Sequence, residues 1–195
     1  MAYHIYTTDG IILKRKAFGE ADIVLYVLTE NLGLIITSAR SARLNKSKLR
    51  GALQEYTLVS ISCVKGKNGW KITNVTDKEN FFWSKPNYSN KVLAQISSLL
   101  LQMIQGESRH PEIFQTTKTA FEFLKFVSEK NIGSFEVLAI LRILYQLGYV
   151  AIGPDTEIFL KNTTEWSELF LEKIADSKKV VVELINKGLK ESHLT

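Results

Sequence analysis

The segment from Ser38 to Gly51, "SARSARLNKSKLRG", carries five cations and no carboxylate. The cations are Arg40, Arg43, Lys46, Lys48 and Arg50. A solvated basic loop is the ordinary explanation for such a run. However, five like charges within eleven residues repel one another unless salt or a polyanion screens them. We therefore expect this segment to contact the phosphates of a nucleic acid.

Further cations accompany this segment in the first part of the chain. Lys14, Arg15 and Lys16 are expected on an earlier loop, and Lys65, Lys67 and Lys71 on a later hairpin. Residues 1–75 hold 11 Lys and Arg against 5 Asp and Glu, whereas residues 76–195 hold 14 against 15. The formal net charge of +5 thus comes from the first part alone. Such asymmetry indicates contact with nucleic acid or with an anionic membrane surface.

Aromatic residues are interleaved with these cations. They are Tyr6, Phe18, Tyr26, Tyr56 and Trp70. A cationic groove with exposed aromatic rings holds single strands without reading their sequence. We expect Tyr26 and Tyr56 in the core. For Phe18 and Trp70, which flank loops, burial and base stacking both stay open, and we include these two in the candidate DNA-binding set.

No catalytic or metal-binding motif is found. The stretch "GKNGWK" lacks the GK[ST] ending of a phosphate-binding loop, and His4, His110 and His193 are far apart in the sequence. Cys63 is the single cysteine, which excludes an internal disulfide and a zinc site built on thiolates. Its place in an alternating strand favours a small buried residue over a nucleophile. We expect no enzymatic activity, no cofactor and no metal.

The expected location is cytoplasmic. One cysteine suits a reducing compartment. The N-terminal "MAYHIYTTDG" has no basic region followed by an apolar one, so it does not resemble a signal peptide. The longest helix-like apolar run, "SSLLLQMI", is too short to span a bilayer.

The first 76 residues predict five strands that would position the cations. The segments, which share β-branched and aromatic residues or alternation, are 3–15, 21–29, 33–39, 55–65 and 69–76. Asp9-Gly10 suggests a bend, and Asn68-Gly69 is a strong hairpin signal. Five short strands fit a small, mostly antiparallel barrel, and the OB-fold is the candidate.

After Pro86 the apolar spacing becomes helical. The predicted helices are 89–106, 110–131, 134–148, about 164–175 and 178–190. Ser89 or Asn90 and Ser134 are suited to helix starts, and Gly106 and Gly148 to helix ends. The core of this part is expected from Leu93, Leu100, Phe121, Leu124, Leu138, Leu141 and Leu144. The fold class is therefore α+β, with an OB-fold domain over 1–80 and an all-helical domain over 81–195.

The order and spacing of several motifs resemble the bacterial RecO family. The resemblance depends on Gly10-Ile11-Ile12-Leu13-Lys14, Gly19-Glu20-Ala21-Asp22, Thr29-Glu30 before Gly33, Ala39-Arg40-Ser41-Ala42-Arg43, and Lys48-Leu49-Arg50-Gly51-Ala52-Leu53-Gln54. The segment "FEVLAILRILYQLGYV" is similar to the family's helical segment that ends in Leu-Gly-Tyr. The first 80 residues and about 130–150 carry the likeness.

The resemblance implies a non-enzymatic recombination mediator of the RecF pathway. Such a protein binds single- and double-stranded DNA, anneals complementary strands, joins RecR and helps RecA displace single-strand-binding protein. By position, the implied DNA contacts are Lys14, Arg15, Arg40, Arg43, Lys46, Lys48 and Arg50. Many family members have a four-cysteine zinc finger after Leu-Gly-Tyr, whereas this chain continues "VAIGPDTEIFLKN" and resembles a short form without it.

Two alternative functions stay open at this point. One is an RNA-binding OB-fold protein tied to translation, which would use the same groove. The other is an adaptor whose helical part binds proteins and whose basic barrel docks on an acidic partner.

Overall fold

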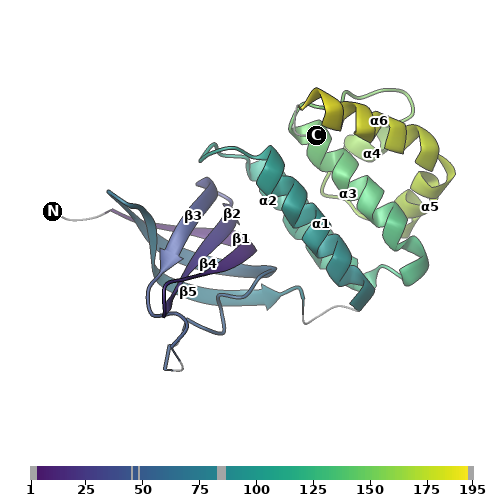
Figure 1. Cartoon of the computed structure of the whole chain (residues 1–195). Coiled ribbons are helices and arrows are strands. Elements are labelled where there is room, and N and C mark those ends of the chain that lie inside the picture. The colour runs from purple at the N-terminus through teal and green to yellow at the C-terminus, as the bar shows by residue number, and fades with distance from the viewer. Residues whose placement is uncertain (1–3, 45, 48, 83–86, 193–195) are drawn as a thin grey trace. The chain divides into compact units, whose positions relative to one another are not determined.

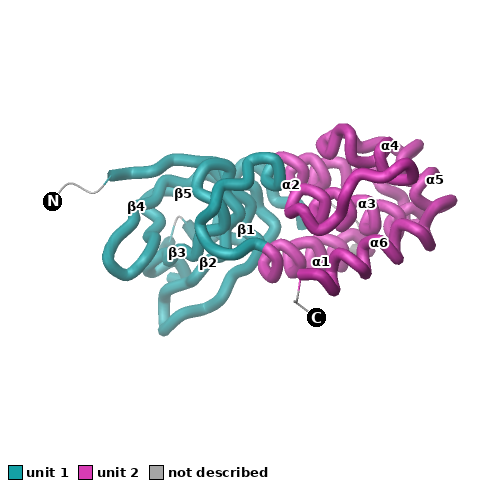
Figure 2. Tube along the Cα trace, turned by 90° about the horizontal axis from the view of Figure 1, so that it is seen from above, with its two compact units in different colours: residues 1–84, 104–114 teal, residues 85–103, 115–195 magenta. Residues whose placement is uncertain are grey.

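The computed structural model describes residues 4–44, 46–47, 49–82 and 87–192. The chain forms two compact units, coloured separately in Figure 2. The first consists of residues 1–84 and 104–114, and the second of residues 85–103 and 115–195. A short segment that follows the first helix thus belongs with the strands. The division into an OB-fold domain over 1–80 and a helical domain over 81–195 stays a prediction.

The first unit contains a closed barrel of five strands in the order β1-β2-β3-β5-β4 (Figure 1). The strands are β1 (Ile5–Phe18), β2 (Asp22–Thr29), β3 (Gly33–Ala39), β4 (Thr57–Gly66) and β5 (Gly69–Asn80). All neighbours pair antiparallel except β3 and β5, which pair in parallel. The predicted OB-fold, followed by helices, is confirmed.

Alternation of side chains explains why these segments form a barrel. In β2, Ile23, Leu25 and Val27 are buried, while Val24 and Tyr26 between them are partly exposed. One face of each strand therefore fills the barrel and the other faces outward. The shared interior consists of Ile12, Ile23, Leu25, Val27, Ile35, Ala39, Ala42, Leu53, Val59, Ile61, Cys63 and Trp70.

Strand β1 differs from the prediction in two ways. Its register is continuous through Asp9 and Gly10, and the irregularity lies between Ile12 and Lys14. The strand also continues to Phe18, so Lys14, Arg15 and Lys16 lie on a strand and the predicted loop is wrong. Charged residues are poor strand formers, but pairing with β2 overrides this preference because Lys14 and Lys16 face outward to solvent.

The predicted hairpin between the last two strands is confirmed. Gly66 pairs with Gly69, and Gly69 has a φ of +92°, a conformation that glycine adopts without strain. The barrel closes where Thr37 and Ser38 of β3 pair with Trp70 and Lys71 of β5.

The second unit is helical. Its helices are α1 (Asn87–Met103), α2 (Pro111–Phe123, of which residues 111–114 belong to the first unit), α3 (Ile132–Gln146), α4 (Glu157–Leu160), α5 (Glu168–Asp176) and α6 (Lys178–Glu191). Two short 3-10 turns, Leu124–Phe126 and Glu129–Asn131, replace the end of the long second helix that we predicted. Helix α3 packs against α1, α4, α5 and α6.

The predicted end of α3 is confirmed, whereas the predicted starts of α1 and α3 are not. Gly148 follows α3 with a φ of +81°, and the amide of Tyr149 donates to the carbonyl of Leu144, as in a glycine-terminated helix. Helix α1 begins before Ser89 and Asn90, and α3 begins before Ser134. These residues therefore lie inside helices and do not cap them. All seven predicted core residues of this unit are buried.

A buried arginine organises the segment that follows α3. Arg142 is 0% exposed, and its guanidinium donates to the backbone carbonyls of Phe159 (2.9 Å), Thr163 (3.3 Å) and Glu165 (2.6 Å). Its Cζ lies 4.3 Å from the ring centroid of Trp166. Desolvation lowers the pKa of Arg142 to about 10, so the group stays cationic at neutral pH.

Candidate nucleic-acid interface

The basic segment is anchored to the barrel by small apolar residues. Ala39, Ala42 and Leu53 are 0% exposed and belong to the barrel interior. Between and beyond them the described cations are exposed; these are Arg40, Arg43, Lys46 and Arg50. Lys48 lies outside the described residues. The alternation of buried alanines and exposed cations explains why a highly charged segment is part of a folded barrel.

Backbone hydrogen bonds tie this segment to the turn between β1 and β2. The amide of Arg43 donates to the carbonyl of Ala21 (2.9 Å), and the amide of Ser41 donates to Oδ1 of Asp22 (2.8 Å). The Arg43 side chain also donates from Nη1 to the carbonyl of Gly19 (3.1 Å). The first two cations of the segment are thereby placed beside the β1–β2 turn.

That turn presents an aromatic side chain to solvent. Phe18 is 64% exposed, although a large apolar side chain would be stabilised by burial. It ends β1, where it pairs with Asp22. An exposed ring beside cations is the arrangement on which an unpaired base can stack.

The outer face of the barrel places three more cations in adjacent positions. Lys16 is opposite Val24, Val24 is opposite Ser38, and Ser38 is beside Lys71. This row crosses four strands, so its two lysines have Cα atoms roughly 14 Å apart at the usual strand spacing. In the next row, Lys14 is opposite Tyr26 and Tyr26 is opposite Ile36.

Partly exposed apolar groups lie between these lysines. Ile36 is 55% exposed, and the Lys16 Nζ lies 5.5 Å from the ring centroid of Tyr26. Tyr26 is therefore half-buried on the outer face, not part of the interior that we predicted for it. We call Lys14, Lys16, Tyr26, Ile36 and Lys71 the outer face. Within the described residues, no ion pair is recorded for its three lysines.

Arg15 is separated from this outer face. It is opposite Leu25, whose side chain is in the barrel interior, and it is half-buried. It lines a cavity of about 340 Å³ together with Gln54, Glu55, Tyr56, Asn80 and Phe82. Tyr56 is half-buried there with a φ of +58°, and desolvation with the neighbouring Glu55 carboxylate raises its pKa.

The β4–β5 hairpin holds the remaining candidates. Lys67 is exposed and Lys71 is half-buried, and both line a hollow of about 310 Å³ with Val64, Gly66 and Asn68. Lys65 is exposed but paired, since its Nζ lies 2.6 Å from Oε2 of Glu107. Among the described residues, two lysines of the hairpin, Lys67 and Lys71, form no ion pair, and Lys65 is neutralised by Glu107.

Trp70 corrects the expectation of a stacking ring. It is 5% exposed and belongs to the barrel interior, because its strand position pairs with the buried Thr37. Its ring packs edge-on against Tyr6, with centroids 5.3 Å apart. Such a ring cannot stack on a base, so of the two aromatic candidates only Phe18 has the exposure that stacking requires.

Glu107 is the residue that the sequence reasoning missed. It precedes α2, and its carboxylate accepts from Lys65 Nζ through Oε2 and from Trp70 Nε1 through Oε1, at 3.0 Å. The hydrogen bond from Lys65 lowers the pKa of Glu107, and the bond from Trp70 acts in the same direction. No pattern in the sequence connects position 107 with positions 65 and 70, so only the fold reveals this contact.

The combination of these features suits a polyanion more than a small molecule. The outer face and the β1–β2 turn present lysines, an exposed phenylalanine and a tyrosine around strands β2 and β3. In OB-folds this face and the adjoining loops hold oligonucleotides. Lysines and arginines bind phosphates, and aromatic rings stack on bases.

Other kinds of site receive no support from the described residues. Cys63 is buried, and desolvation raises the pKa of its thiol to about 11, which suits a core residue. Across residues 4–44, 46–47, 49–82 and 87–192, no three His, Cys, Asp or Glu side chains are grouped as metal ligands. In this same part of the chain, no helix combines the length and apolar character that crossing a membrane requires.

Comparisons with known proteins agree with the geometry of the barrel. The family described as "Recombination protein O N terminal" matches residues 1–81. The chain is 32% identical over 122 residues to the DNA repair protein RecO of Dehalococcoides mccartyi. The aligned residues make up 62% of this chain and 48% of the relative. The chain is also 31% identical over 156 residues to the DNA repair protein RecO of Thermodesulfovibrio yellowstonii. These residues make up 77% of this chain and 59% of the relative.

A third relative shows the same pattern. The DNA repair protein RecO of Desulfitobacterium hafniense is 26% identical over 147 residues, which is 74% of this chain and 52% of the relative. The chain thus spans about half the length of the relatives it matches. The barrel, the family match and these relatives agree: residues 1–81 match the N-terminal domain family of recombination protein O, and the chain is similar to DNA repair proteins named RecO.

Proposed function

We propose that the barrel binds single- and double-stranded DNA and that the chain acts as a recombination mediator in DNA repair. The observation that carries this proposal is the outer face, where Lys14 and Lys16 lie beside Tyr26, Lys71 lies beside Ser38 of β3, and none of the three lysines forms an ion pair within the described residues. The exposed cations of the basic segment, at the β1–β2 turn, extend the same surface.

Phosphate contacts would supply most of the affinity and little sequence preference. Annealing follows from the same physics, because two strands held along a cationic surface have their mutual repulsion screened while their bases stay accessible. In this proposal the chain joins RecR, contacts single-strand-binding protein and helps RecA load onto DNA. This work belongs in the cytoplasm, which the single cysteine also suits.

The test compares two triple variants that remove equal charge. One replaces Lys14, Lys16 and Lys71 by alanine, and the control replaces Lys173, Lys179 and Lys190, which are exposed on α5 and α6. Binding of a fluorescent single strand is measured by anisotropy over a range of salt. Each lost phosphate contact lowers the salt slope by about 0.7, so the outer-face variant should lose about 2 and the control almost nothing.

Several outcomes contradict the proposal. A flat salt response of the unmodified protein, or equal losses in the two variants, rules out the outer face as a phosphate-binding surface. Preference for structured RNA over single-stranded DNA in competition favours the RNA-binding alternative. Capture of an acidic protein from a nuclease-treated lysate, without DNA binding, favours the adaptor.

A further inference from the structure

The Glu107 carboxylate accepts hydrogen bonds from two donors at the β4–β5 hairpin. Its two oxygens are used separately, with Oε2 at 2.6 Å from Lys65 Nζ and Oε1 at 3.0 Å from Trp70 Nε1. The Lys65 Nζ also lies 5.4 Å from the Trp70 ring centroid, so the two donors converge on one place. A cation and a neutral N–H aimed at two oxygens of one anion form a small anion-binding corner.

The backbone that carries Glu107 is closely fitted to the barrel. Gly33, at the start of β3, has a φ of +71°, and a Cβ built there would be 2.2 Å from the Ser108 carbonyl oxygen and 2.8 Å from the Glu107 carbonyl carbon. Arg109 Nη2 donates to Oδ1 of Asn31 at 3.0 Å. The segment is thus held on both sides of Glu107, while the Glu107 side chain itself is 41% exposed, which leaves room for another rotamer.

We propose that Lys65 and Trp70 Nε1–H form a phosphate subsite of the DNA surface, which Glu107 fills until a DNA phosphate displaces it. This inference rests on the proposed function and adds a form of autoinhibition to it. A carboxylate and a phosphodiester both present one negative charge over two oxygens, so the same two donors satisfy either one.

The position of this corner supports its connection to the DNA surface. Lys65 pairs with Trp70 across the hairpin, and Lys71, the next residue of β5, belongs to the outer face. In OB-folds the loop between the last two strands borders the ligand surface. The Lys65 and Trp70 side chains point to the face of the hairpin opposite that of Lys71, so a strand on Lys71 would reach the corner by passing around the tip of the hairpin. The Lys65 charge would be available there only when Glu107 leaves.

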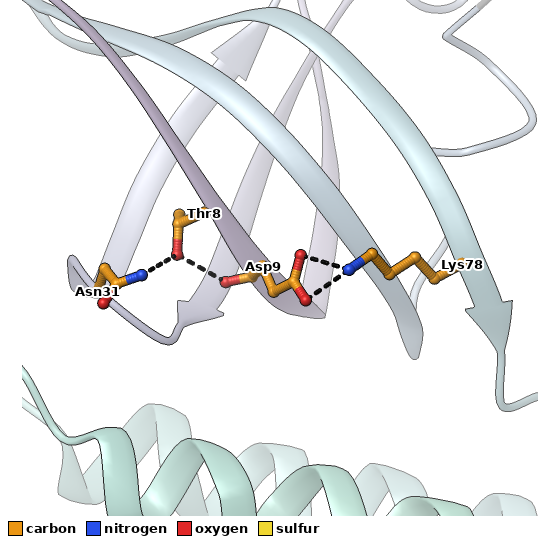
Figure 3. Close-up of polar contacts among 4 residues, drawn as sticks. All are labelled: Thr8, Asp9, Asn31 and Lys78. Carbon is orange, nitrogen blue, oxygen red and sulfur yellow. Dashed lines mark hydrogen bonds and ion pairs between the residues drawn. The ribbon is translucent and has the colours of Figure 1, made fainter.

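A second ion pair of the barrel provides a matched control. Lys78 Nζ lies 2.6 Å from Asp9 Oδ2, which equals the Lys65–Glu107 distance, and both pairs are partly exposed. Figure 3 shows both Asp9 oxygens facing Lys78, with Thr8 and Asn31 beside them. Asp9→Asn and Glu107→Gln each remove one negative charge, but only the second removes the carboxylate from the anion-binding corner.

The experiment measures affinity for a single strand over a range of salt in these variants. Glu107→Gln should bind on the order of three- to tenfold more tightly at low salt and steepen the salt slope by about 0.7, as one additional phosphate contact requires. Asp9→Asn should change the affinity less than twofold and leave the slope unchanged, because long-range charge effects are weak when screened.

Removal of Lys65 tests whether the gain in DNA affinity of Glu107→Gln comes from the anion-binding corner. Lys65→Ala should weaken Glu107→Gln more than it weakens the unmodified protein, since Lys65 is already neutralised in the latter; the difference measures their coupling. Equal gains in Glu107→Gln and Asp9→Asn, or a gain that survives Lys65→Ala, would overturn the inference while DNA binding by the unmodified protein still stands. Salt-independent binding by the unmodified protein instead refutes the proposed function.

Discussion

Each unit of this chain sets a cation against a tryptophan, and the two pairs differ in what surrounds them. In the barrel, Lys65 lies against Trp70, is exposed and is neutralised by the Glu107 carboxylate. In the helical unit, Arg142 lies against Trp166, is fully buried and donates from Nε and Nη1 to three backbone carbonyls. The first cation has a carboxylate partner at the surface, whereas the second has backbone partners inside the helical unit.

The difference explains why similar contacts serve different purposes. A surface ion pair contributes about 0–1 kcal/mol, so an incoming anion can replace its acid. A buried cation bound by carbonyls instead fixes the backbone that supplies them, here α4 and the segment that follows it. The type of partner and the degree of burial therefore distinguish a binding group from a structural one better than residue type does.

Removal of the buried cation should have the largest effect. Arg142→Ala leaves three carbonyls without their donor and opens a cavity, and each unsatisfied buried group costs about 1–3 kcal/mol. We expect the helical unit to lose about 3–5 kcal/mol of stability in urea denaturation followed by circular dichroism.

Arg142→Lys is the control for charge alone. It keeps the cation but lacks the planar array of donors, so it should recover only part of the lost stability. If Arg142→Ala unfolded at the urea concentration of the unmodified protein, the buried cation would have no structural role.

The thiol of Cys63 tests whether the barrel interior is as closed as the surroundings of Arg142. Burial raises its pKa to about 11, so at pH 8 its thiolate fraction is roughly 100-fold below that of a thiol with an ordinary pKa. We expect a colorimetric thiol reagent to modify the folded protein slowly and the urea-unfolded protein fast. Equal rates in the two states would show that the barrel opens readily.

A substitution at Gly33 should disturb the backbone that carries Glu107. Gly33→Ala places a Cβ against the Ser108 carbonyl, in a left-handed conformation that costs an alanine about 1–2 kcal/mol. Gly19→Ala is the matched control, because Gly19 has a φ of +56° and no atom within 4 Å of its added Cβ. Thermal unfolding should show a larger loss for Gly33→Ala, and equal losses would mean that the close approach is unimportant.

The pH dependence of the surface pair should be the smallest effect. The pKa of Glu107 is lowered in the folded state, so its contribution to stability is present above the pKa of the unfolded chain and is lost as the pH falls through the folded pKa. Screening keeps this contribution below about 1 kcal/mol. Unfolding midpoints at pH 7 and pH 3 should differ slightly less in Glu107→Gln, and a larger difference would contradict the sign.

Local patterns in the sequence predicted the barrel and most helices. The β-branched and aromatic residues of β2, the turn signal before β3, the alternation in β4 and the Asn68-Gly69 turn are all local signals, and the strands and hairpin that they predicted are confirmed. The length of β1 was not predictable in this way, because pairing with β2 overrides the weak strand preference of Lys14 and Lys16. The four-residue helix α4 was also missed, since a single turn leaves no periodic signal.

The candidate site was predictable as a set of charges but not as a geometry. The run of five cations without a carboxylate predicted the basic segment, whereas the burial of Ala39 and Ala42 within it is known only from the structure. Three features of the site depend on contacts between distant positions. They are the location of Arg15 away from Lys14 and Lys16, the burial of Trp70, and the contact of Glu107 with Lys65 and Trp70. Such contacts leave no trace in a single sequence.

The joint between β3 and β5 has a consequence for the order of folding. Thr37 and Ser38 pair with Trp70 and Lys71, so two pairs close the barrel across more than 30 residues, whereas the β2–β3 hairpin joins near neighbours through seven. Closing a long loop costs more chain entropy than closing a short one, and the interactions of only two residue pairs offset little of that cost. We expect the hairpins to form first and this joint last. Trp70 enters the interior at that step, so its indole should mark the moment when the sheet becomes a barrel.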